Sequence, residues 1–288
     1  MNEVLETMLR KYQATNAEER ENAIKEILQE VALAGLSRAG FFHVAAFYGD
    51  TCLRLFHGLN RFSEDLDFAL LAKDPSFRLE DYFSAMQKEF RSLGIEVEIS
   101  LKSKGEQSDV QSAFIKGNTL TLLLHFFPTK SSENSAPSNQ KIKVKFEVDL
   151  DNPSGGSTEV RYRLLPSPYE VLVFDEATLF AGKIHAILCR EYKSRVKGRD
   201  YYDYLFYTAK GTPINLIYLE NKLRNTGVFL QKAPLTLETV KQMLAERFAS
   251  VDYESAKEGV QRFIRVKQSL ELWKKELFLS TLDELKKQ

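Results

Sequence analysis

The sequence predicts an α+β protein, with a mixed-sheet domain at residues 1–165 and a helical bundle domain at residues 166–288. Two observations lead to this prediction. Several short segments in the first half alternate apolar and polar residues, which is typical of half-buried strands. After about residue 166, apolar residues recur at helical spacing and few strand signals remain.

Helical spacing of apolar residues predicts the first elements, which are helices over residues 3–12 and 18–39. Asn16 precedes the second stretch and is a residue type that often caps a helix. The apolar run "FFHVAAFY" at 41–48 suits a buried strand or a continuation of that helix. A short helix is expected in "TCLRLF" after Gly49, and a longer helix over 77–92.

Alternation predicts strands at residues 64–70, 95–102, 119–127 and 141–150. The polar stretch "PTKSSENSAPSNQ" at 128–140 predicts a loop between the last two strands. Periodicity in the second half predicts helices over 176–194, 199–210, 214–224, 236–249, 254–266 and 268–287.

Composition limits the classes of function. A length of 288 residues with 43% hydrophobic residues is typical of a globular protein with a substantial core. The formal net charge is zero, so nucleic acid would have to bind at a local patch. Two cysteines make neither a disulfide framework nor a zinc site, which favours a reducing compartment such as the cytoplasm. We expect no contact with a membrane, because the N-terminus does not resemble a signal peptide and no apolar stretch approaches about 20 residues.

Asp65 and Asp67 are separated by one residue on the predicted strand at 64–70, so their side chains share a face. Neighbouring carboxylates repel each other, and a divalent cation such as Mg²⁺ or Mn²⁺ removes this conflict. Glu147 and Asp149 share a face of the strand at 141–150 and offer a third carboxylate. Taken alone, two aspartates at this spacing more often mark a solvated strand end.

Three segments resemble motifs of the AbiEii-type toxin nucleotidyltransferases, in the polymerase-beta-like superfamily. "YGDTCLRLFHGLNRFSEDLDFAL" at 48–70 is similar to the first motif, which is close to G-G-T-x-L-R-L followed by R-F-S-E-D-L-D. "LFAGKIHAILCR" at 179–190 resembles the lysine-bearing helix of the family, and "KGRDYYDYLFY" at 197–207 resembles its K-x-R-D-x-x-D motif. The chain departs from the first motif at Asp50, which replaces a glycine and places a carboxylate where phosphates would approach.

The resemblance implies a nucleotidyltransferase that moves nucleotides from an NTP to RNA, in particular tRNA, and acts as a toxin with a cognate antitoxin. It implies that Asp65 and Asp67 hold the metal, with Glu147 completing the set and Asp149 as the alternative. The turn that leads into the helix after Gly49 would offer amides to phosphate, and Lys183 would offer a compact cation. The implied catalytic residues are Asp65, Asp67, Lys183, Asp200 and Asp203, and the implied nucleotide-binding residues are Gly49, Asp50, Thr51, Arg54 and Lys183.

Asp200 and Asp203 lie three residues apart and therefore share a helix face. One of them would order Lys183 or contact the acceptor, and the sequence does not choose between them.

Basic residues gather between the last two motifs, with tyrosines directly after them. Such a segment binds an RNA backbone and stacks bases, or else it is a solvated helix end followed by core tyrosines. The basic residues are Arg190, Lys193, Arg195, Lys197 and Arg199, and the tyrosines are Tyr201, Tyr202, Tyr204 and Tyr207.

Two other functions stay open on the sequence. One is a nucleotidyltransferase that modifies a small molecule or a protein side chain. The other is a catalytically silent binding module, which the carboxylate of Asp50 supports because it opposes phosphate binding.

Overall fold

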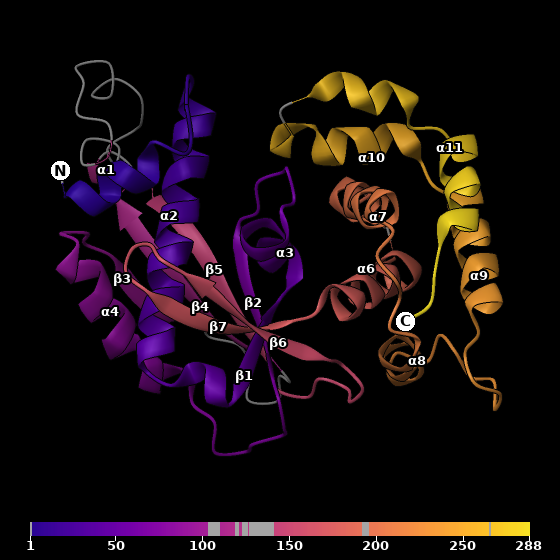
Figure 1. Ribbon diagram of the computed structural model, residues 1–288, viewed down its shortest axis with the longest axis horizontal. Coiled ribbons are helices and arrows are strands. Elements are labelled where there is room, and N and C mark those ends of the chain that lie inside the picture. Colours follow the sequence, from indigo (N-terminus) through magenta and orange to yellow (C-terminus); the bar gives the residue numbers. More distant parts are fainter. Residues whose placement is uncertain are drawn as a thin grey trace. The chain divides into compact units, whose positions relative to one another are not determined.

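A seven-stranded mixed sheet organises the first half of the chain (Figure 1). The structure, a computed structural model, describes residues 2–102, 110–118, 121–122, 126, 141–191, 196–264 and 266–288. The chain forms two compact units. The sheet unit comprises Met1–Cys52, Phe62–Asn152 and Glu159–Val173, and the helical unit comprises Leu53–Arg61, Pro153–Thr158 and Phe174–Gln288. The domain boundary expected between residues 165 and 166 stays a prediction.

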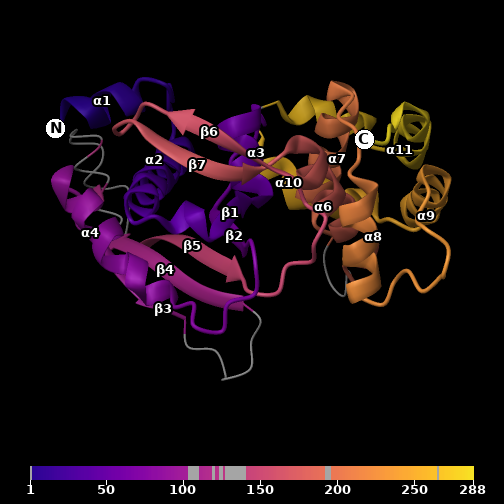
Figure 2. The same ribbon diagram turned by 60° about the horizontal axis from the view of Figure 1, so that its bottom comes forward.

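The sheet combines parallel and antiparallel pairs of neighbouring strands. β2 is parallel to β5 and antiparallel to β1, while β1 is parallel to β7. β4 is antiparallel to both β3 and β5. Figure 2 shows β6 and β7 at one end of the sheet and β3 and β4 at the other. The strand order is β3 (Glu98–Leu101), β4 (Val110–Asn118), β5 (Lys141–Asp149), β2 (Asp65–Leu70), β1 (Ala45–Tyr48), β7 (Tyr169–Phe174) and β6 (Thr158–Arg163). A mixed sheet with helices confirms the α+β class.

Helices α1 (Glu3–Leu9), α2 (Ala17–Arg38) and α4 (Phe83–Ser92) belong to the sheet unit. The side chain of Asn16 caps α2 by accepting a hydrogen bond from the backbone N–H of Glu19 at 2.9 Å. α2 packs against α4 and β5. At their crossing, a Cβ on Gly35 would lie 2.8 Å from Cα of Met86, so the close approach of the two helices requires glycine.

The helical unit is built around α6, which contacts α7, α8 and α9. Helix α7 packs on α10 so closely that a Cβ on Gly198 would lie 1.8 Å from the carbonyl oxygen of Ala256. Tyr201 and Tyr204 are fully buried and contact the rings of Phe248 and Phe278. Tyr207 is also buried and stacks on Phe180, so three of the four tyrosines are core residues that are closed to nucleic acid. The helices are α6 (Glu176–Cys189), α7 (Gly198–Lys210), α8 (Leu216–Asn225), α9 (Leu237–Ala249), α10 (Tyr253–Val260) and α11 (Lys275–Ser280).

The prediction of a strand at 119–127 was wrong where the structure describes it, because Thr121, Leu122 and Phe126 are helical. The other residues of that segment, and the loop expected at 128–140, lie outside the described residues. The strand beside β5 is instead β4, at Val110–Asn118. Leu122 and Phe126 are buried, and a short buried apolar run fits a helix as well as a strand.

Two more differences concern strands β1 and β7, which are neighbours in the sheet. Phe41–His43 form a 3₁₀ turn, so only the second half of the run at 41–48 is a strand. β7, in the segment "YEVLVF", lies in the region expected to be helical. It is a short apolar run that pairs in parallel with β1, and this partner is distant in sequence. Among the described residues, no helix is both long and apolar enough to cross a membrane.

Candidate active site

The register of β2 and β5 brings acidic residues together on the sheet unit. Asp65 lies opposite Lys145 and Asp67 lies opposite Glu147 in this parallel pair. Registered neighbours in a sheet present their side chains on the same face, and alternate residues of one strand do so too. Both aspartates therefore share a face with Glu147, while Leu66 points into the core on the other face.

The beginning of α3 (Gly49–His57) is fastened to β2 beside these residues. Gly49 has φ +79, and a Cβ there would lie 2.6 Å from Oδ2 of Asp67. Only glycine combines this left-handed backbone with such close contact to a carboxylate. The buried hydroxyl of Thr51 donates a hydrogen bond to the backbone carbonyl of Asp65. The two predicted turn residues thus set the position of α3 relative to the aspartates.

The electrostatic surroundings of Asp67 are unfavourable to its negative charge. Burial raises the pKa of Asp67 to about 7, and the charges of Asp65, Asp50 and Glu147 act in the same direction. Lys145 opposes this rise. We call Asp50, Asp65, Asp67 and Glu147 the carboxylate group. A nearby divalent cation would stabilise the ionised form of Asp67.

Glu147 already has two partners on the sheet. Its carboxylate pairs with the ammonium of Lys145 and accepts a hydrogen bond from Oγ of Ser112 at 2.9 Å. Asp149 lies opposite Ala69 and accepts from the backbone N–H of Asp151 at 3.1 Å. Within the described parts of the chain, no three His, Cys, Asp or Glu side chains form a ready metal site. Two neighbouring carboxylates, Asp65 and Asp67, fit magnesium, which commonly takes one or two carboxylates and completes its ligands with water and phosphate oxygens.

A second group of charges lies within the helical unit, between α6 and α7. The ammonium of Lys183 lies 2.9 Å from Oδ1 of Asp200 and 2.8 Å from Oδ2 of Asp203. All three side chains are buried, with Lys183 the most exposed at 10%. Both aspartates of the third motif therefore contact Lys183, and which of them serves the active site stays a prediction.

Each of these aspartates also binds an arginine. Nε and Nη2 of Arg61 donate to the two carboxylate oxygens of Asp203 at 2.6 and 2.5 Å, and the arginine side chain is fully buried. Nη1 of Arg190 pairs with Asp200 from a half-exposed position. We call these five residues, Arg61, Lys183, Arg190, Asp200 and Asp203, the charge network.

Sequence reasoning missed the roles of both arginines. Arg61 was noted only as the first residue of "RFSEDLD", and Arg190 only as one of several basic residues. A fully buried arginine needs a carboxylate partner. Nothing in the local sequence indicates that this partner is Asp203, which is 142 residues away.

The remaining predicted residues are less tightly grouped. Arg54 donates to the backbone carbonyl of Leu59 at 2.9 Å, which closes the turn after α3. Lys197 is exposed, and the guanidinium of Arg199 lies 4.5 Å from the ring centre of Phe263. Lys193 and Arg195 lie outside the described residues. RNA binding by this stretch stays a prediction.

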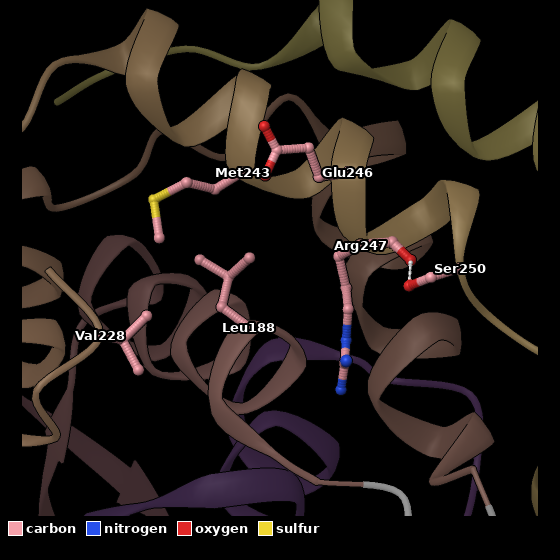
Figure 3. Close-up of a pocket in the computed structure, with 6 residues that line it drawn as sticks. All are labelled: Leu188, Val228, Met243, Glu246, Arg247 and Ser250. Atoms are coloured by element: carbon pink, nitrogen blue, oxygen red, sulfur yellow. Dashed lines mark hydrogen bonds between the residues drawn. The ribbon is translucent and has the colours of Figure 1, made fainter.

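An open pocket of about 290 Å³ lies in the helical unit, between α6 and α9 (Figure 3). Arg247 forms one wall, and its Nε donates to the carbonyl oxygen of Ile187 at 2.9 Å. The pocket contains none of the predicted site residues. Its lining residues are Leu188, Val228, Met243, Glu246, Arg247 and Ser250.

The predicted site residues are divided between the two units. Asp65, Asp67 and Glu147 belong to the sheet unit, whereas Lys183 and its aspartates belong to the helical unit. That both groups act on one nucleotide stays a prediction.

Comparison with known proteins identifies a family and a fold. A family model described as nucleotidyl transferase AbiEii toxin, type IV TA system, matches residues 31–274. No curated protein sequence matches the chain. MenT4, a nucleotidyltransferase toxin from Mycobacterium tuberculosis H37Rv, is similar in structure with a TM-score of 0.50, at 15% identity over 96% of this chain and 98% of MenT4. JHP933 from Helicobacter pylori is similar with a TM-score of 0.44, at 17% identity over 94% of this chain and 90% of JHP933.

Proposed function

Because the chain belongs to the AbiEii family of nucleotidyl transferase toxins, we propose that it transfers nucleotides from an NTP to RNA, and that the RNA is tRNA. As a member of this family, the chain is a nucleotidyltransferase and the toxin of a type IV toxin–antitoxin pair. An NTP substrate and an antitoxin partner follow from the same membership. The acceptor, the metal and the roles of individual residues belong to the proposal.

The single observation that carries the proposal is the cluster of Asp65, Asp67 and Glu147 on β2 and β5. Asp65 and Asp67 would hold Mg²⁺ or Mn²⁺, with Glu147 beside them. When bound, such a cation bridges phosphate oxygens and neutralises the charge that develops on them. The raised pKa of Asp67 supports this role. Burial and the neighbouring carboxylates make the negative charge of Asp67 unfavourable, and a bound cation would offset that charge.

The nucleotide would be bound through its phosphates. The first backbone amides of α3 lie at the N-terminal end of the helix, which begins at Gly49, and such an end favours an anion. Lys183 would contribute a point charge, oriented by Asp200 and Asp203. Catalysis of nucleotidyl transfer consists mainly of such positioning and charge neutralisation, so a site without a covalent nucleophile suffices.

The acceptor would bind near the start of α7, where Lys197 is exposed and Lys193 precedes it in sequence. Positive side chains bind an RNA backbone without reading its sequence. A net charge of zero for the whole chain makes a local basic segment necessary for such binding.

Labelling of acceptors tests the function directly. The purified protein is incubated with Mg²⁺, total cellular extract and each NTP labelled at its α-phosphate, and the products are separated into RNA, protein and small molecules. Label in tRNA supports the proposal. Label in protein or in a small molecule overturns the choice of acceptor. Absence of label from every fraction, with NTP binding retained, indicates a silent binding module, for which Asp50 is the structural argument.

A further inference from the structure

The charge network contains more carboxylate than one lysine can offset. Lys183 contacts both Asp200 and Asp203 within 2.9 Å, and these three side chains alone carry one net negative charge. Such a group would repel a triphosphate instead of attracting it. Lys183 could not then act as a phosphate contact without help from other residues.

Arg61 and Arg190 change the sign of this balance. Arg61 binds both oxygens of Asp203, and Arg190 binds Oδ2 of Asp200, while Lys183 binds Oδ1 of the same carboxylate. Counted together, the five side chains of the charge network carry three positive and two negative charges. The aspartates can therefore orient Lys183 without cancelling its charge.

We propose that Arg61 and Arg190 are positioning residues that offset Asp203 and Asp200, so that Lys183 presents a net positive charge to the triphosphate of the nucleotide. This inference rests on the proposed function, because it takes Lys183 as the phosphate contact. It adds two residues that act through the aspartates, and it assigns Arg190 to nucleotide binding instead of to the RNA.

The position of Arg190 is fixed by the fold. Arg190 follows the last residue of α6, seven positions after Lys183, and this spacing returns a side chain to the same helix face. Arg247 of α9 holds this end of α6, with hydrogen bonds to the carbonyl oxygens of Ile187 and Arg190. The guanidinium of Arg190 is therefore presented to Asp200 by a fixed helix end, although 49% of its side chain is exposed.

Arg190 gives the sharper test, because removing the buried Arg61 is expected to destabilise the fold. The probe is inorganic tripolyphosphate with Mg²⁺, and its dissociation constant is measured by calorimetry on the full chain. Arg190→Gln should weaken binding by about tenfold, since a nearby positive charge is lost at a partly buried site. Arg190→Lys, which keeps the charge, should bind within about twofold of the wild type.

The double variant Arg190→Gln with Asp200→Asn separates charge balance from a merely structural role. It removes one charge of each sign, so the network regains a net positive charge and affinity should recover to within about threefold of the wild type. Arg262→Gln removes an exposed arginine outside the network and serves as the matched control, with affinity unchanged. Melting temperatures of all variants identify any loss of folding.

Three results would overturn the inference. They are wild-type affinity in Arg190→Gln, a double variant that binds as weakly as Arg190→Gln, and a wild-type chain that fails to bind tripolyphosphate. Failure of the proposed function gives a different result. If the variants show the expected affinities for tripolyphosphate but no RNA is labelled, RNA is rejected as the acceptor and this inference stands. Labelled RNA together with an unchanged affinity in Arg190→Gln rejects the inference alone.

Discussion

Arg61 and Asp203 form a two-pronged ion pair between fully buried side chains that lie 142 residues apart in the sequence. The pair joins the segment after α3 to α7, and both lie within the helical unit. Asp203 is shared with Lys183, so the same carboxylate stabilises the fold and orients the predicted phosphate contact.

Arg61→Met should lower the free energy of unfolding by about 3–5 kcal/mol, because it leaves a buried carboxylate without its main partner. Urea denaturation measures the change. Lys73→Met removes one side of an exposed ion pair with Asp151 and should cost at most about 1 kcal/mol. Similar, small effects in both variants would show that the buried pair adds little to stability.

Asp67→Ala should abolish nucleotide transfer while leaving the metal-free protein at least as stable as the wild type. The substitution removes one of several carboxylates that repel each other. RNA labelling and thermal melting without metal measure the two effects. Asp74→Ala, at an exposed position in the same unit, is the control. Near-normal transfer by Asp67→Ala at saturating Mg²⁺ would reject the metal site.

Gly49→Ala should reduce both stability and transfer, and Gly58→Ala provides a matched comparison. Both glycines have positive φ, so alanine costs about 1–2 kcal/mol of backbone strain at either position. A Cβ at position 49 would meet Asp67, whereas nothing lies within 4 Å at position 58. Gly49→Ala should therefore cost at least about 1 kcal/mol more, by denaturation, and it alone should slow transfer. Equal effects of the two variants would contradict the contact with Asp67.

The contribution of His185 to stability should fall as the pH drops from 6.5 towards 4, opposite in sign to that of Asp67, whose raised pKa favours the folded state in acid. Burial, with the nearby charges of Lys222 and Arg190, lowers the pKa of His185 to about 4. Between these pH values the unfolded chain binds a proton that the folded chain does not, so acid favours unfolding, by at most about 3 kcal/mol. On acidification over this range, the denaturation midpoint of the wild type should fall relative to that of His185→Gln. Lys222→Met should show part of the same difference, and profiles that match the wild type in both variants would exclude a contribution from His185.

Reversing two charges before α7, with Lys193→Glu and Lys197→Glu, should reduce RNA labelling more than NTP binding. Each lost phosphate contact also lowers the salt dependence of RNA binding, so the difference from the wild type should be largest at low salt. Lys232→Glu with Lys241→Glu reverses two charges before and within the start of α9 and should leave labelling unchanged. Unaltered labelling in the first variant across a salt series would move the acceptor site to another surface.

The sequence predicted the carboxylates better than it predicted their surroundings. Alternation along β2 placed Asp65 and Asp67 on one face, and alternation along β5 did the same for Glu147. Periodicity reports which side of an element is buried, and this was enough for most helices and for the central strands. It does not report which element lies alongside, so β4, β6 and β7 were missed.

The charge network could not be predicted for the same reason. Asp200 and Asp203 were seen to share a helix face, but their partners come from α6, from its end and from the segment after α3. Ion pairs between distant segments leave no periodic signal. Arg61 stands in the polar stretch "NRFSED", so its burial and its need for a partner are not evident from the sequence.

The contact between α7 and α10 restricts which amino-acid substitutions this protein can accept during evolution. A side chain at Gly198 would strike the backbone of Ala256, and one at Gly259 would strike the carbonyl of Val196 and the amide of Gly198. Neither glycine can take a side chain without a shift of the backbone, because each added Cβ would meet main-chain atoms. Gly198 begins the helix that carries Asp200 and Asp203. A side chain at position 259 would press on the backbone of Gly198 and so displace the two aspartates that bind Lys183. Related sequences that keep this lysine are therefore expected to keep both glycines as a pair.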